Sequence, residues 1–96
     1  MALVLYADRE KAEKLREILL KDDLVSRANV ILKDAKMMDK EGFYIRILGD
    51  EKQCERALEL SKGLAEEVTG EEKEKILNLM KKEDEEMLSG FSGIFR

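Results

Sequence analysis

One stretch constrains the fold of this chain more than any other, namely residues 42–49, where apolar side chains alternate between two glycines. Phe43, Ile45 and Ile47 fall on one side of an extended backbone, and the residues between them fall on the other. Period-two alternation of aromatic and β-branched residues is typical of a half-buried β-strand. We therefore expect a strand whose Phe43/Ile45/Ile47 face packs on the core. Its expected partners are Leu15, Leu19, Leu58 and Leu64.

The rest of the chain supplies further strands and helices around this segment. Residues 2–7 form a short run that is apolar on both faces, which indicates a buried strand. Apolar residues at three- and four-residue spacing indicate amphipathic helices, two of which have aspartates, Asp8 and Asp50, placed as N-caps. In chain order we expect a strand over 2–7, a helix over 9–24, a strand over 26–38, the strand over 43–48, and helices over 50–68 and 71–88.

This order of elements matches the split βαβ arrangement of ferredoxin-like domains. We expect a two-layer α+β sandwich, ferredoxin-like or a truncated variant of that fold, with an antiparallel sheet and the helices on one face. Residues 1–89 then form a single domain. Residues 90–96 form an apolar tail of Gly, Ser and Phe. The tail is expected to be either a terminal edge strand beside residues 2–7 or an interaction segment.

Composition argues against several classes of function. The chain has 96 residues, of which 42% are charged, with a net charge of −4 and no histidine. The acidic excess argues against nucleic-acid binding, and the lack of histidine removes the commonest general base and metal ligand. A single cysteine excludes an internal disulfide framework. We expect a cytoplasmic protein with a thermophile-like, Lys- and Glu-rich composition and no membrane-spanning segment.

Few residues are candidates for chemistry. Cys54 lies in the first turn of a predicted helix, where the dipole favours a thiolate, but it also lies on the apolar stripe of that helix. We therefore expect a buried, inert thiol. The acidic residues lack the spacing of a calcium loop, and the glycines fit no phosphate-binding motif. We expect no catalytic residue, no cofactor and no metal site.

Residues 40–47 are similar to the ribonucleoprotein octamer of RNA-recognition domains, which share the ferredoxin-like topology. Gly42 and the aromatic Phe43 match that octamer. Glu41 stands where the octamer has a basic residue, and Ile45 stands where it has a second stacking aromatic. The resemblance implies RNA binding on the sheet, which depends on stacked aromatic side chains and positive potential.

The other face of the central strand, together with the tail, favours association with a protein. Tyr and Arg are enriched in interface cores, and large apolar side chains in a short tail need a surface to cover them. The candidate interface residues are Tyr6, Tyr44, Arg46, Leu48, Phe91, Ile94 and Phe95. We expect a non-enzymatic, self-associating interaction or regulatory module. Its expected partner is a second copy of the chain, in a homodimer, and an unknown protein is a further candidate partner. Two alternatives stay open: a small-ligand sensor that binds at a dimer interface, and a weak RNA-binding domain.

Overall fold

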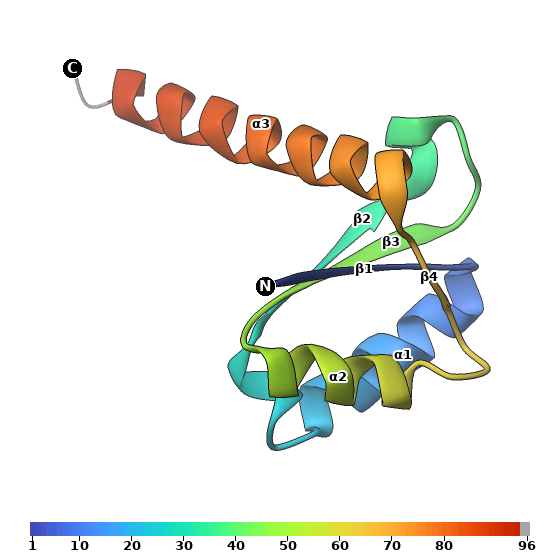
Figure 1. Ribbon diagram of the computed structural model, residues 1–96. Helices are drawn as coiled ribbons and strands as arrows, with labels where there is room; N and C mark the ends of the chain where they lie inside the picture. The colour runs from blue at the N-terminus through green and yellow to red at the C-terminus, as the bar shows by residue number, and fades with distance from the viewer. Residues whose placement is uncertain (95–96) are drawn as a thin grey trace.

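The computed structural model describes the backbone of residues 1–94 and the side chains of residues 1–82. It confirms an α+β fold with a four-stranded antiparallel sheet in the order β2–β3–β1–β4 (Figure 1). The elements are β1 (Ala2–Ala7), α1 (Arg9–Lys21), η1 (Val25–Arg27), β2 (Asn29–Asp34), η2 (Ala35–Met38), β3 (Phe43–Leu48), α2 (Glu51–Leu60), β4 (Glu66–Glu67) and α3 (Gly70–Ile94). Apart from the two η segments, the first six elements are β1, α1, β2, β3, α2 and β4, which is the ferredoxin-like order. The helix α3 is an addition to that order.

The alternating strand lies at the centre of the sheet, as predicted. β3 pairs with β1 on one side and with β2 on the other. Ile45 and Ile47 are fully buried and Phe43 is half-buried, all three in one core with α1 and α2. This core contains all the partners expected from the sequence, namely Leu15, Leu19, Leu58 and Leu64.

Both predicted N-caps are present and set the starts of the two helices beneath the sheet. The Asp8 carboxylate accepts a hydrogen bond from the Lys11 backbone N–H at 2.9 Å. Asp50 and Gln53 form a reciprocal capping box, with distances of 2.8 and 2.9 Å. These local contacts satisfy backbone N–H groups that have no partner inside the helix.

The predicted helix over 50–68 is too long, because α2 ends at Leu60. The chain then turns at Gly63, whose φ of 80° lies in the left-handed region that glycine adopts readily. It returns along β1 as the short strand β4, and the Val68 N–H donates to the Val4 carbonyl at 2.8 Å. The expected second strand is likewise shortened, because η2 follows β2 from Ala35.

The fourth strand is therefore β4, which corrects one of the two alternatives given for residues 90–96, that of a terminal edge strand beside residues 2–7. α3 continues as a helix to Ile94, so the part of the tail that the structure describes is helical. β4 pairs with β1 only at Leu5 and Tyr6, so it is a very short edge strand.

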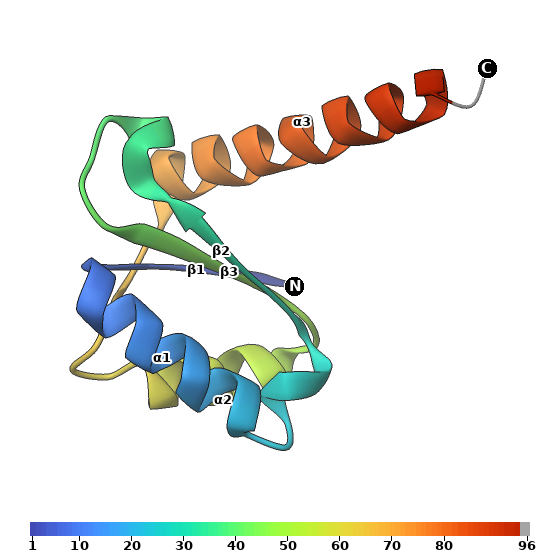
Figure 2. The ribbon, with the colours of Figure 1, turned by 180° about the vertical axis from the view of Figure 1, so that it is seen from behind.

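The helices do not all lie on one face of the sheet, which corrects a second expectation. α1 and α2 cover one face, whereas α3 crosses the opposite face (Figures 1 and 2). Ile76 and Met80 of α3 are buried there against Val4, Tyr44 and η2. The thin apolar stripe seen in the sequence is enough to attach this helix, and it forms a second, smaller core.

α3 runs on beyond the sheet on which it packs. In both ribbon views its last turns lie outside all the other elements, at the end of the molecule where β1 begins (Figures 1 and 2). The helix has 25 residues, which corresponds to about 37 Å at 1.5 Å per residue. It accounts for much of the longest dimension of the molecule, 46 Å.

Candidate functional site

The predicted interface residues of the sheet lie on the α3 face, but that face is not open. Tyr44 is fully buried and Arg46 is only 6% exposed, whereas Tyr6 is half-buried. Leu48, at the far end of β3, remains 38% exposed. The expectation of a free Tyr/Arg surface is therefore wrong for Tyr44 and Arg46, because α3 packs over this face within one chain.

A polar cluster joins the first turn of α3 to the sheet. One carboxylate oxygen of Glu72, Oε1, accepts hydrogen bonds from the Tyr44 hydroxyl at 2.9 Å and from Lys40 Nζ at 2.7 Å. The Tyr6 and Tyr44 rings lie 5.3 Å apart, and Lys40 Nζ lies 5.5 Å from the Tyr6 ring centre. The Tyr6 hydroxyl donates to the Glu41 carbonyl. The cluster thus connects β1, the β2–β3 hairpin and α3.

Three titratable groups of the cluster have pKa values shifted away from neutrality. Burial and the nearby Glu72 raise the pKa of Tyr44. The hydrogen bond between Lys40 and Glu72 raises the pKa of the lysine and lowers that of the glutamate. A general acid or base works best with a pKa near the operating pH. These shifts hold the phenol protonated and the ion pair charged, which suits a fixed attachment of α3 better than proton transfer.

Sequence reasoning missed Lys40 and Glu72. The Glu72 carboxylate accepts hydrogen bonds from residues 28 and 32 positions away in the chain. No periodicity or local motif links positions so far apart in the chain. The one signal in the sequence was Tyr44 on the central strand, because a tyrosine hydroxyl requires a hydrogen-bond partner when it is buried.

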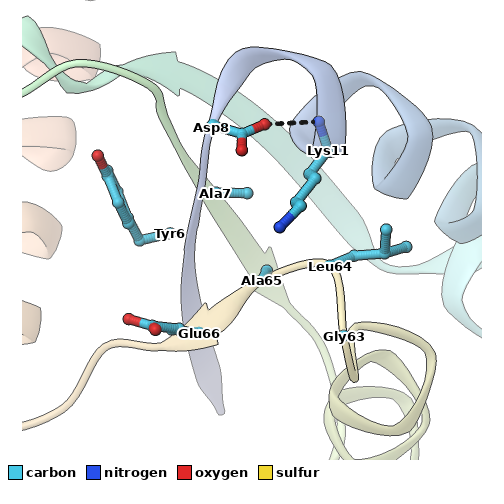
Figure 3. Close-up of a pocket in the computed structure, with 8 residues that line it drawn as sticks. All are labelled: Tyr6, Ala7, Asp8, Lys11, Gly63, Leu64, Ala65 and Glu66. Atoms are coloured by element: carbon cyan, nitrogen blue, oxygen red, sulfur yellow. Dashed lines mark hydrogen bonds between the residues drawn. The ribbon is translucent and has the colours of Figure 1, made fainter.

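Open depressions border Tyr6 on more than one side, and two of them adjoin the start of α1. One, of about 430 Å³, lies between the start of α1 and the loop that leads into β4. Tyr6 and Glu66 point to one side of β1 there, and Lys11 and Leu64 lie on the other (Figure 3). The second depression, of about 590 Å³, has both acidic and basic side chains. Its charged lining residues are Asp8, Arg9, Asp34, Lys36, Lys40 and Glu41.

These depressions give no chemical preference for a ligand. Binding pockets for small molecules combine an enclosed, mostly apolar lining with a few convergent polar groups. Here charges of both signs are interspersed around surfaces that open to solvent. Among the described residues, no group of three or more His, Cys, Asp or Glu is placed to hold a metal ion.

Cys54 is buried, as expected from its place on the apolar stripe of α2. Its Sγ lies 3.9 Å from the Ile47 carbonyl oxygen and 4.0 Å from that of Met1. Burial raises the pKa of the thiol. A reactive cysteine needs the opposite shift, because the thiolate is the nucleophile.

The residues that carry the RNA-binding resemblance lie apart from the α3 face. Phe43, the aromatic that matches the octamer, packs in the core formed with α1 and α2. Gly42 has a φ of 95° and adjoins the Ala7 carbonyl, where a Cβ atom would be 2.6 Å from the oxygen. The glycine is thus explained by the close approach of β1 to the turn before β3.

The predicted tail residues fall largely outside what the structure describes. Phe91 and Ile94 belong to the backbone of α3, but their side chains lie beyond the described side chains, and Phe95 lies outside the described residues altogether.

No α-helix in the described part of the chain is long and apolar enough to cross a membrane. No family model, curated protein or solved structure matches this chain.

Proposed function

We propose that this protein is a non-enzymatic interaction module that self-associates as a homodimer through the C-terminal half of α3. The observation that carries this proposal is that α3 continues past its own sheet (Figures 1 and 2). A helix is rarely stable in water without packing of its apolar face, so an extension of this kind needs a partner surface. We call residues 83–94 the α3 extension.

The sequence of the α3 extension is amphipathic in register with the docked part of the helix. Met87, Phe91 and Ile94 follow Met80 at spacings of seven, eleven and fourteen residues. These spacings place them on the same helix face as Met80. In the sequence, the apolar spacing that begins with the buried Ile76 and Met80 therefore continues to Ile94.

The chemistry of the other candidate surfaces supports association over catalysis. In the Tyr44–Glu72–Lys40 cluster, the tyrosine hydroxyl and the lysine ammonium both donate to the same Glu72 oxygen. Cys54 is buried with a raised pKa. Neither group suits catalysis, so the apolar stripe in the sequence of the α3 extension is the stronger candidate for a functional surface.

Sedimentation equilibrium on the full chain tests the proposal. We expect a reversible dimer, which Phe91→Glu weakens by roughly tenfold or more in dissociation constant, as loss of a central apolar contact does. Leu20→Glu is the control, because Leu20 is 47% exposed on α1 and lies far from the extension in sequence. A monomeric wild-type chain at all concentrations, or equal effects of the two substitutions, would contradict the proposal.

A further inference from the structure

We infer that α3 is a hinged lid, which leaves the sheet as one unit by turning at Thr69 and Gly70 while the rest of the fold stays intact. The lid controls access to the face of the sheet around Val4 and Tyr44. The inference concerns a single chain. It therefore goes beyond the proposed self-association and does not depend on it.

The lid and the body of the protein have separate cores. The core between the sheet and the helices α1 and α2 contains no described residue of α3. The helix α3 instead contributes the buried Ile76 and Met80 to the second core, on the opposite face of the sheet. An antiparallel sheet is commonly covered on one face only. Release of α3 therefore leaves a body whose main core is complete.

The connection between β4 and α3 has the properties of a hinge next to a fixed point. Val68 is buried, and its N–H donates to the Val4 carbonyl at 2.8 Å. The next two residues, Thr69 and Gly70, are exposed. Gly70 has a φ of 66°, and a Cβ atom built on it would meet no other atom within 4 Å. A glycine in open space lets the backbone turn there without a clash, so the helix pivots directly after an anchored residue.

The described contacts that hold the lid closed are few. In the first turn of α3, Glu72 Oε1 accepts hydrogen bonds from Tyr44 and Lys40, and we call this group of contacts the Glu72 latch. Ile76 and Met80 follow as the buried side chains of the described part of the helix. Both ribbon views show the later turns diverging from the sheet (Figures 1 and 2). An element held by few buried contacts opens at a lower free-energy cost than the whole protein unfolds.

The lid controls a face with the chemistry of an interaction surface. Val4 and Tyr44 are fully buried in the core that α3 completes. Arg46 pairs with Val4 in the sheet, so its side chain lies on the same face, and it is 6% exposed. Tyrosine and arginine are enriched in interface cores. Because these side chains are accessible only when α3 is released, the closed helix is an autoinhibitory contact within the chain.

Thiol labelling under the lid tests the inference. The reporter is Val4→Cys in a chain that also carries Cys54→Ala, so that the single thiol lies on the face covered by α3. Reagent concentrations are chosen at which the labelling rate is proportional to the reagent, because the rate then reports the population of the open state. Glu72→Ala is expected to raise this rate roughly tenfold, as loss of hydrogen bonds to a charged group does. Glu74→Ala is the matched control, because Glu74 is exposed on the same turn, and it should leave the rate unchanged.

A third variant, Val25→Ala, separates opening of the lid from unfolding of the whole chain. Val25 is fully buried in the core with α1 and α2, so its truncation weakens the body equally with the lid open and with the lid closed. Urea denaturation should show a loss of global stability in this variant. Its labelling rate at position 4 should nevertheless equal that of the reporter chain.

Equal acceleration of labelling by Val25→Ala and Glu72→Ala would overturn the inference, because Val4 would then be uncovered only when the whole chain unfolds. Equal rates for Glu72→Ala and Glu74→Ala would overturn it as well, since the Glu72 latch would not hold the lid. Circular dichroism establishes that the reporter chain is folded. If Val4→Cys does not fold, Ala35→Cys replaces it, because Ala35 is fully buried in the same core.

Discussion

At the scale of single residues, Glu72 is the side chain that most directly joins α3 to the rest of the protein. It accepts hydrogen bonds from Lys40 and from the buried Tyr44, while apolar contacts of Ile76 and Met80 complete the attachment. The Tyr44 hydroxyl is part-buried, so loss of its acceptor leaves a polar group that water reaches poorly. Glu72 therefore stabilises the α3 face more than its place near the surface indicates.

Glu72→Ala is expected to lower the free energy of unfolding by about 1–2 kcal/mol, the range for a hydrogen bond to a charged group at a partly exposed site. The control is Glu74→Ala, because Glu74 is exposed on the same turn of α3. Urea denaturation measures both variants. Equal stability losses in the two variants would mean that the cluster does not hold the helix.

The same contact predicts a pH dependence. The Glu72 pKa is lowered from its ordinary value of 4.5 by Lys40 and Tyr44, so its contribution is complete above that value. It is lost as the pH falls through the lower folded-state pKa. The stability difference between the wild type and Glu72→Ala should therefore be constant near neutrality and shrink below pH 4.5. A difference that grows as the pH falls would contradict this account.

At the scale of elements, the sequence predicted the features that depend on local pattern. The β3 alternation, the Asp8 cap and the Asp50–Gln53 capping box are all set by residues near one another. The end of α2 was mispredicted, because Leu64, Ala65 and Val68 continue the helical spacing although they line the loop and strand beyond Gly63. Periodicity records which residues share a face, but tertiary contacts decide where the helix ends.

The alternation of β3 makes a direct prediction about its two faces. Ile45→Ala should lower the free energy of unfolding by about 2–5 kcal/mol, because Ile45 is fully buried in the core with α1 and α2. Leu48→Ala, at the partly exposed end of the same strand, should cost much less. Chemical denaturation of both variants checks the ranking. A loss below about 1 kcal/mol for Ile45→Ala would mean that the core is organised around other residues.

At the scale of the whole molecule, the sheet is covered on both faces, which the sequence did not reveal. The amphipathic stripe of α3 was visible, but nothing in the sequence shows whether a third helix joins the first two or crosses to the other face. This choice changed the candidate site, because Ile76 and Met80 of α3 pack against Tyr44, and both Tyr44 and Arg46 are buried on that face. Of the predicted interface residues on the sheet, Leu48 stays exposed and Tyr6 is half-buried, whereas Phe91, Ile94 and Phe95 lie beyond the described side chains.

The most direct test of the central claim is the mass of the chain in solution with and without its last residues. Sedimentation equilibrium should show a dimer for the full chain, and deletion of residues 90–96 should shift it to monomer while the melting of the core with α1 and α2 persists. A truncated chain with the same oligomeric state and the same melting temperature as the full chain would contradict the account. Residues 90–96 would then contribute neither to association nor to stability.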